Sequence, residues 1–451
     1  MRKSILIAAS NLRRARGQTA AITVLILLAS AMLNLGLMLS LDYKSNFDRC
    51  HDRLHDGHVS LGISASEPGI EDFLEEAFQE DGRAVEYTKN DALIMVGYFA
   101  YNGGEVNTEF VIMEKETALN RPVGRMEIVE EGEYKSGVYL PMLYGADGKI
   151  AVGEDIDITI GSHVMRYKVC GFLNSAMAGS HNCFMSALLL TADKYEELKE
   201  AGYAPASTYV SVRIRDKAES EYFEAELKNK ASARYQSVRI LSNNYEQVSS
   251  SRYISQMICV GVVSAMAFIV TLITLVVISS NVIQYVQENM KNLGALKAVG
   301  YQSRQIVAGL LLQFLGVVLL AAAAGIGLSY CLFPAVNDMM IAQTGIPYRV
   351  HFLPLPCAIT LCAMGGAVGF VVWLSAGRIR KIEPIVALRQ GVLTHSFKRN
   401  HVPLERTQAP LQLALALKTC ASGVKQNVTV CITMLVLSLF LLFSTISPEN
   451  T

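Results

Sequence analysis

The segment Glu288-Asn-Met-Lys-Asn-Leu-Gly-Ala-Leu-Lys-Ala-Val-Gly-Tyr-Gln-Ser-Arg-Gln305 separates two long apolar stretches of the chain. Residues 258–281 before it and residues 306–333 after it contain no charged side chain. A helix crosses a bilayer with about 20 apolar residues, so each stretch is long enough to span a membrane. The connection between them, residues 282–305, is therefore expected to be a short loop at a membrane surface.

The charges of this loop indicate the side of the membrane on which it lies. Lys291, Lys297 and Arg304 stand against one acid, Glu288. Lysine and arginine are enriched in cytoplasmic loops of membrane proteins. We therefore expect residues 282–305 in the cytosol.

The apolar residues of the loop predict a short helix. Leu293, Leu296 and Val299 recur every three residues, which predicts that they share one helical face. Gly300-Tyr301 is expected to end this helix before the next span begins. A short helix presented to the cytosol is suited to contact another protein.

The composition agrees with a membrane protein that also carries a large polar domain. Hydrophobic residues make up 51% of the chain and charged residues 18%, and the charge is unevenly distributed. The net charge of zero averages different compartments and excludes no class of protein. Five uncharged apolar runs are candidate spans: Thr19–Leu41, Ile258–Asn281, Ile306–Phe333, Leu353–Ala376 and Val428–Ile446.

The loops between the spans predict one consistent orientation. The N-terminal residues 1–18 contain basic side chains and no acid, and residues 377–425 are strongly basic, so both are expected in the cytosol. The connection 334–352 and the polar region 42–252 then lie outside. The first apolar run is about twice as long as the core of a signal peptide and no cleavage pattern follows it, so a retained anchor is expected.

The polar region 42–252 has the pattern of a mixed α/β domain. Alternating apolar residues predict strands, and longer periodic segments predict helices. The predicted strands are Val59–Ile63, Ala92–Tyr101, Phe110–Met113, Ile156–Ile160, Val164–Leu173 and Tyr209–Ile214. The predicted helices are Glu71–Phe78, Ala192–Ala201 and Lys217–Arg234, with turns at Asn102-Gly-Gly104 and Ala146-Asp-Gly148. The fold class is thus an α-helical membrane protein with an extracytoplasmic α/β domain inserted between its first two spans.

The sequence contains none of the common catalytic signatures. There is no Gly-x-Ser-x-Gly, no His-Glu-x-x-His and no Gly-x-x-x-x-Gly-Lys-[Ser/Thr] phosphate loop. Any ATP hydrolysis must therefore take place on another polypeptide. No catalytic residue, cofactor or nucleic-acid partner is expected for this chain.

Three histidines after the first span form a weak metal candidate. His51 and His55 are one helical turn apart, and His58 follows, a spacing that can hold Zn²⁺ or Cu²⁺. A solvated stalk leading out of the membrane explains the same residues without metal, and we favour it.

The cysteines do not predict a disulfide framework. Of nine cysteines, only Cys50, Cys170 and Cys183 belong to the external region. Their odd number and irregular spacing argue against a set of bridges, although a single Cys170–Cys183 bridge is left open.

With the loops placed, the chain resembles the FtsX-like permease family, the membrane subunits of ABC transporters that include MacB-type and lipoprotein-releasing systems. The family pattern Glu-x-Gly-x-Leu-(Lys/Arg)-Ala-(Leu/Val)-Gly is similar to Glu288 followed by Leu293-Gly-Ala-Leu-Lys-Ala-Val-Gly300. Arg378-Ile-Arg-Lys-Ile-Glu-Pro-Ile-Val-Ala-Leu-Arg389 resembles the family's Pro-x-x-Ala-Leu-Arg ending. Val152-Gly-Glu-Asp-Ile-Asp-Ile-Thr-Ile160 with Tyr167-Lys-Val-Cys-Gly171 resembles a strand pair of its periplasmic domain.

The resemblance implies a function and its partners. A separate ABC ATPase would receive the cytosolic segment, and the implied coupling residues are Glu288, Leu293, Gly294, Leu296, Lys297, Val299 and Gly300. ATP-driven motion would pass through the spans to the external domain and export or extract a lipophilic or peptide substrate. The alternative is a signalling subunit that controls a cell-wall enzyme or a sensor kinase. An ATPase-independent anchored binding protein would leave the cytosolic helix unexplained.

The chain departs from single-unit members of the family after Arg389. It continues through Leu413-Ala-Leu-Ala-Leu-Lys418 into the fifth run, Val428–Ile446, which is similar in arrangement to the first span. The prediction is the first half of a two-unit permease in a bacterial plasma membrane, with a second permease half or subunit and membrane lipid as further partners. A natural five-span protein is the alternative.

Overall fold

A computed structural model describes residues 16–64, 69–146, 148–180, 183–235, 238–348 and 351–377, together with Ile379 and Ser438. The chain divides into two compact units, which are described separately. One unit holds residues 1–38, 262–331 and 353–451, and the other holds residues 39–261 and 332–352. The predicted fifth span, the N-terminal residues 1–15 and nearly all of the linker 377–425 lie outside the described residues.

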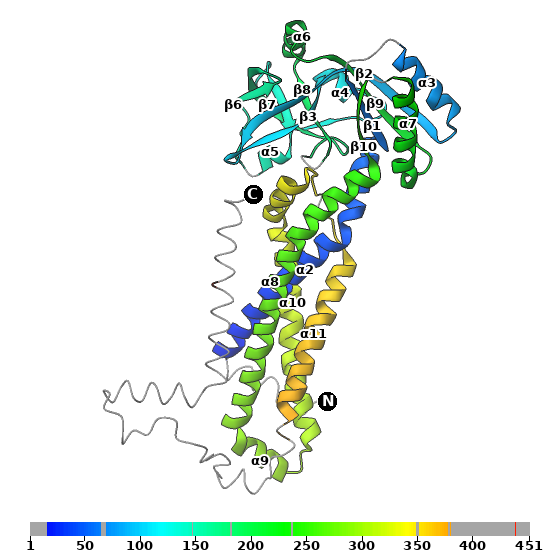
Figure 1. Ribbon diagram of the computed structural model, residues 1–451. Helices are drawn as coiled ribbons and strands as arrows, with labels where there is room; N and C mark the ends of the chain where they lie inside the picture. The colour runs from blue at the N-terminus through cyan, green and yellow to red at the C-terminus, as the bar shows by residue number, and fades with distance from the viewer. Residues whose placement is uncertain are drawn as a thin grey trace, which may run out of the picture. The chain divides into compact units, whose positions relative to one another are not determined.

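Four helices in the described part of the chain are long and apolar enough to cross a membrane. They are α2 (Arg16–Arg53), α8 (Tyr245–Glu288), α10 (Ser303–Thr344) and α11 (Pro354–Ala376), all labelled in Figure 1. The first three contain the first three predicted spans, and α11 matches the fourth from its second residue, Pro354, to its end. The helices α2, α8 and α10 extend well beyond those spans, because polar residues next to an apolar run can continue the same helix.

The loop expected at residues 334–352 is shorter than the sequence suggested. Helix α10 continues through Pro334 and ends at Thr344. Proline removes one backbone hydrogen bond from a helix, but the helix can continue where its other contacts hold it. Met340 and Ile341 are buried beyond the proline and supply such contacts.

A polar link joins three helices of the first unit. Asn34 of α2 donates its side-chain amide to Ser329 Oγ of α10 over 2.8 Å. Thr360 of α11 donates its hydroxyl to Asn34 Oδ1 over 3.3 Å. All three side chains are buried, so the hydrogen bonds satisfy groups that apolar surroundings would leave without water.

The second unit contains a four-stranded sheet with a β-α-β-β-α-β arrangement. Its strands and helices are β1 (Val59–Ser64), α3 (Ile70–Glu80), β2 (Ala84–Tyr101), β9 (Ala206–Ile214), η1 (Lys217–Glu219), α7 (Ser220–Arg234) and β10 (Arg239–Asn244). The strand order is β10-β1-β9-β2 and every pair is antiparallel. This is the order of a ferredoxin-like fold.

One face of this sheet packs against α3 and α7 (Figure 1). Val59, Leu61 and Ile63 alternate along β1 and point into that core, while Ser60 and Gly62 belong to the opposite face. On the helices, Leu74 and Phe223 fill the same core. The two-residue period of the strand therefore fixes which face the helices cover.

A small closed barrel is inserted between β2 and β9. Its further elements are β3 (Gly104–Glu114), α4 (Lys115–Leu119), β4 (Glu127–Glu131), β5 (Val138–Pro141), α5 (Leu143–Ala146), β6 (Asp155–Ile160), β7 (His163–Asn174), β8 (Met185–Leu190) and α6 (Ala192–Ala201). The pairings run β2-β3-β8-β5-β7-β6 and return to β2, because β6 pairs with both β7 and β2. Strand β2 is long because its first half pairs with β9 and its second half pairs with β3.

The structure confirms the predicted fold class of a mixed α/β domain between the first two apolar helices. All the predicted strands and helices of this region are present, and α6 has the predicted bounds. The turn at Asn102-Gly103 has positive φ at both residues, 54° and 77°, as a tight β-hairpin requires. The strands β4, β5, β8 and β10 were not predicted.

Candidate functional site

The helix expected in the segment between two spans is present as α9 (Met290–Ala298; Figure 1). Helix α8 ends at Glu288, and α9 ends before Gly300. Gly300 has φ 99°, and the following amide, of Tyr301, donates to the carbonyl of Leu296 over 3.0 Å. A glycine with positive φ is a common way to end a helix, which confirms the predicted turn.

The three apolar residues of this segment do not share one exposed face, which corrects the sequence interpretation. Leu293 is 3% exposed and packs in the core of the helical unit, and Leu296 is partly buried against the same core. Val299 is 80% exposed. The physical reason is that a spacing of three residues falls short of the helical period of about 3.6, so Val299 lies roughly 120° around the helix from Leu293. Val299 itself keeps helical backbone angles, and its amide donates to the carbonyl of Ala295 over 3.0 Å.

The other predicted coupling residues divide in the same way. Gly294 is buried, whereas Glu288 and Gly300 are exposed. The ammonium group of Lys297 donates to the carbonyl of Ile379 over 2.7 Å, and burial lowers the pKa of Lys297. The exposed surface of the segment therefore includes three of the expected residues, Glu288, Val299 and Gly300. Its other exposed residues were not expected: Lys291, Asn292, Ala295 and Ala298.

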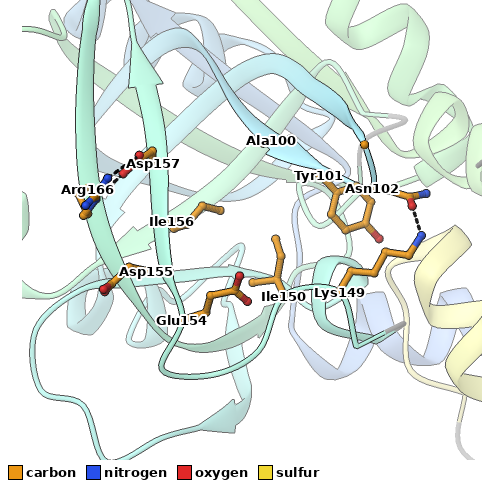
Figure 2. Close-up of a pocket in the computed structure, with 11 residues that line it drawn as sticks. Ala100, Tyr101, Asn102, Lys149, Ile150, Glu154, Asp155, Ile156, Asp157 and Arg166 are labelled. Carbon is orange, nitrogen blue, oxygen red and sulfur yellow. Dashed lines mark hydrogen bonds and ion pairs between the residues drawn. The ribbon is translucent and has the colours of Figure 1, made fainter.

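A hollow of about 510 Å³ lies at one end of the barrel in the second unit (Figure 2). Its floor is apolar and includes Ile150 and Ile156, both buried in the barrel core. Its rim carries Glu154, Asp155 and Asp157. The volume suits a small ligand, since such sites usually measure about 300–1,000 Å³.

Two of the three acidic side chains on this rim already form ion pairs. Arg166 donates from Nε to Asp157 Oδ1 over 2.7 Å and from Nη2 to Asp157 Oδ2 over 2.9 Å, and these bonds lower the pKa of Asp157. Lys168 lies 2.8 Å from Asp155. Glu154 accepts from the amide of Ala151 and has no ion-pair partner among the described residues. The lining contains no serine, cysteine or histidine, so it offers no nucleophile of those types.

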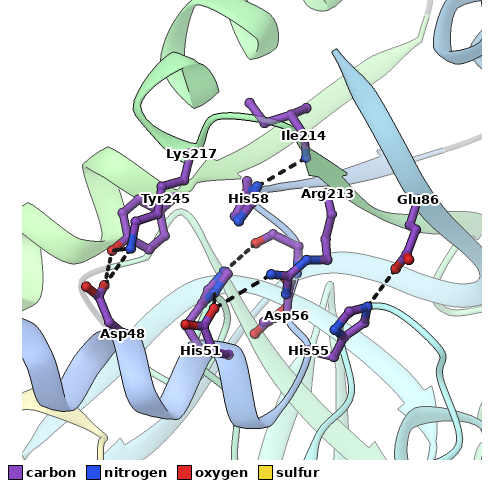
Figure 3. A network of polar contacts seen from close by, with 12 residues as sticks. Asp48, His51, His55, Asp56, His58, Glu86, Arg213, Ile214, Lys217 and Tyr245 are labelled. Atoms are coloured by element: carbon purple, nitrogen blue, oxygen red, sulfur yellow. Dashed lines mark hydrogen bonds and ion pairs between the residues drawn. The ribbon is translucent and has the colours of Figure 1, made fainter. Parts of the chain in front are cut away.

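The three histidines proposed as weak metal candidates have different partners (Figure 3). His55 Nε2 lies 2.6 Å from an oxygen of exposed Glu86. His51 and His58 are buried and stack with ring centroids 5.3 Å apart. Across the described residues, no group of three or more histidine, cysteine or acidic side chains is arranged to hold a metal ion. The structure therefore brings two of the three together, in a stack.

Cys50, Cys170 and Cys183 of the second unit are free and buried. Cys170 packs in one hydrophobic cluster with Tyr139 and Leu173, and Cys183 packs in a different one with Phe47. The Sγ atom of Cys183 lies 3.9 Å from Nη2 of Arg252. Burial raises the pKa of both thiols. The Cys170–Cys183 bridge left open by the sequence is not formed.

Arg252 is a buried residue that no sequence pattern singled out. It is 0% exposed, and its guanidinium donates to the carbonyls of Thr344 and Ser175 over 3.0 Å and 3.1 Å. It joins α8, the end of α10 and the loop after β7. In the sequence, its only notable feature is its position shortly before the uncharged run 258–281, and that position does not predict that the side chain is buried.

Comparisons with known proteins agree with the motif in the helical unit. Residues 264–384 match the family model described as FtsX-like permease C-terminal. No curated protein matches the chain. This matched range includes α9, α10 and α11 and most of α8.

Two solved structures are similar to part of the chain. The periplasmic region of MacB from Actinobacillus actinomycetemcomitans is 8% identical, with a TM-score of 0.21, and the match covers 44% of this chain and 94% of that one. The extracellular domain of the noncanonic ABC-type transporter YknZ from Gram-positive bacteria is 10% identical, with a TM-score of 0.20. That match covers 40% of this chain and 99% of that one.

Proposed function

We propose that this chain is the permease subunit of an ABC transporter of the FtsX-like type. A separate ATPase would bind at α9, and its ATP-driven motion would pass through the apolar helices to the α/β unit. The match of residues 264–384 to the permease model supports this proposal. The single observation that carries it is the geometry of α9, which is anchored in the helical core by Leu293 and exposed at Val299.

The geometry of α9 suits the transmission of force. A helix that only lay on lipid headgroups would have no need of a side chain fixed in the helical core. Leu293, only 3% exposed, makes α9 move with the helices, so that a push on the exposed end reaches α8 and α10. No catalytic role for this chain is part of the proposal.

The proposed orientation follows from the charges of the loops. The N-terminus and α9 lie in the cytosol, and the α/β unit lies outside a bacterial plasma membrane. A second permease half or subunit would complete the transporter. The substrate would be a lipophilic or peptide molecule that is exported or extracted.

The test uses a photo-crosslinking amino acid at Val299 in the full chain, co-expressed with a candidate partner ABC ATPase from the same organism. Val85 is a matched control, because it is an exposed valine, 58% exposed, in the α/β unit. We expect a crosslink to the ATPase from position 299 and none from position 85. Equal or absent crosslinking at both positions would refute the coupling assignment.

A substitution at the same position predicts how far binding of the ATPase should fall. Val299→Asp places a carboxylate in an apolar contact, which costs several kcal/mol when the charge is left unpaired. Recovery of the ATPase with the chain should fall at least about tenfold, since each 1.4 kcal/mol is tenfold in affinity. Val85→Asp should leave recovery unchanged at equal membrane abundance.

The signalling alternative predicts a different response of the complex. An export permease should show ATPase activity that its substrate stimulates, measured with the complex in lipid vesicles. A signalling subunit should bind a wall enzyme or kinase through the α/β unit and should transport no ligand. Stimulation by such a protein partner, and by no small molecule or peptide, would replace the export proposal.

A further inference from the structure

The backbone of His58 connects two elements of the second unit. Its amide donates to the carbonyl of Val212 in β9 over 2.8 Å, and its carbonyl accepts from the amide of Tyr245 over 2.8 Å. Val212 lies in the middle of the sheet, and Tyr245 is the first residue of α8. His58 therefore lies where α8 joins the sheet.

The side chain of His58 adds a hydrogen bond that only the neutral ring can accept. The amide of Ile214 donates to Nδ1 over 3.1 Å (Figure 3). A backbone amide is always a donor, so Nδ1 must carry its lone pair and no proton. Protonation of Nδ1 would set two donors against each other and break this bond.

A second imidazole lies against the first. The rings of His51 and His58 stack at an interplanar angle of 8°. The ring of Tyr245 meets both edge-on, with its centroid 5.2 Å from that of His51 and 6.1 Å from that of His58. His51 is 1% exposed, and its Nε2 lies 3.0 Å from the carbonyl of Gly57, which can only accept. His51 belongs to α2, so the stack joins α2 to the residue that holds α8.

The charged groups around the stack oppose a positive charge on His58. Three basic side chains lie near His58: His51 of α2, Arg213 of β9 and Lys217 of η1. Each disfavours a positive charge on the His58 ring. Burial is the largest cause and lowers the pKa of His58 to about 4. A protonated His58 would therefore find little compensation.

The acidic groups near the stack already have partners. Asp48 of α2 lies 3.0 Å from Lys217 Nζ, and Asp52 lies 3.6 Å from Arg213 Nη2. Asp56, in the turn between α2 and β1, is 2% exposed and accepts from the amides of Gly57 and Met177. Burial raises the pKa of Asp56, which weakens it further as a counter-ion.

We propose that His58 is an acid-sensitive joint. In its neutral form it holds the start of α8 and the end of α2 to the sheet, and protonation at Nδ1 releases them. The sign follows from linkage: the neutral ring is favoured in the closed joint, so stability is full above the ordinary pKa of histidine and is lost as pH falls toward about 4. Because the joint lies within one unit, it does not depend on the proposed ATPase.

Hydrogen exchange of the full chain in detergent tests the proposal. The peptides to follow are 47–62 and 243–250, with α6 as an internal reference, and rates are corrected for the intrinsic effect of pH. Between about pH 7.5 and about pH 5, the opening equilibrium of the joint should rise roughly 30-fold in the wild type. The reference peptides of α6 should not change.

Two matched asparagine variants identify the group that titrates. In His58→Asn, the side-chain oxygen can accept from Ile214 as Nδ1 does but cannot be protonated, so the acid response should disappear. In His55→Asn, which removes the exposed histidine beside Glu86, the acid response should remain. An unchanged acid response in His58→Asn would overturn the proposal, and so would its loss in His55→Asn alone.

A measurement on the wild type covers the case in which His58→Asn does not fold. With ¹⁵N-labelled histidine, at least one ring should keep the neutral form with an unprotonated Nδ1 down to about pH 5, well below the pKa of about 6.5 of an unperturbed histidine. If every histidine becomes charged near that pH, the proposed joint does not exist.

Discussion

At the scale of single residues, two glycines of the second unit have the same backbone conformation and different surroundings. Gly202 ends α6 and Gly345 ends α10, and each has φ 66°. A β-carbon on Gly202 would meet nothing within 4 Å, whereas one on Gly345 would lie 2.1 Å from the carbonyl oxygen of Gly179. Gly202 therefore needs only conformational freedom, and Gly345 also needs the absence of a side chain.

Alanine substitution of the two glycines should lower the free energy of unfolding by different amounts. Gly202→Ala should cost about 1 kcal/mol, because an L-residue is strained in the left-handed region. Gly345→Ala should cost about 3 kcal/mol, because the carbonyl of Gly179 belongs to the backbone and cannot move aside as a flexible side chain would. Thermal unfolding of the full chain in detergent measures both, and equal losses would show that the contact at Gly345 is not tight.

At the scale of elements, Arg252 fastens α8 to the end of α10 and to the loop after β7. A cation at the carbonyl end of a helix is favoured by the helix dipole, and Thr344 is the last residue of α10. The guanidinium is fully buried and forms no ion pair with a carboxylate among the described residues. Its two carbonyl partners therefore carry the compensation for its burial.

Removal of Arg252 should loosen all three elements together. Arg252→Met leaves the carbonyls of Thr344 and Ser175 buried without these donors, which we expect to cost about 3 kcal/mol. Arg49→Met is the matched control, because its side chain is 49% exposed and its ion pair with Asp42 should contribute less than about 1 kcal/mol. Faster hydrogen exchange at residues 174–180 and 340–346 only in Arg252→Met would support the assignment, and the same exchange in both variants would contradict it.

At the scale of the whole molecule, the folded unit around the α/β domain differs from the polar region seen in the sequence. The sequence suggested residues 42–252, but the unit also contains residues 332–352. Ile346 from that segment packs with Phe47 and Tyr245, and Asn46 donates to the carbonyl of Pro347 over 3.3 Å. A fragment limited to 42–252 would leave these contacts unmade.

The orientation of the whole chain can be tested by cysteine labelling in intact cells. Glu200 on α6 and Gln302 after α9 are both exposed. An impermeant maleimide should label Glu200→Cys and should leave Gln302→Cys unlabelled until the membrane is opened, with the parent chain as the blank. Labelling of Gln302→Cys in intact cells would reverse the proposed topology.

The sequence by itself determined the features that local patterns encode. Uncharged runs of sufficient length located the four helices, since burial in lipid requires continuous apolar residues. Two-residue alternation located strands such as β1 and β6, and the glycine at 300 located the end of α9. The predicted contact of α9 with an ATPase rests on those same local features and stays a prediction.

Tertiary structure alone decided the features that depend on residues distant in sequence. Strand β8 is buried along its whole length and shows no alternation, and β4 is rich in glutamate, so neither has a local strand signal. The burial of Leu293, Arg252 and His58 likewise depends on which elements pack against them. A local pattern records which side of an element is apolar, but the partner that covers that side is fixed only when the whole chain has folded.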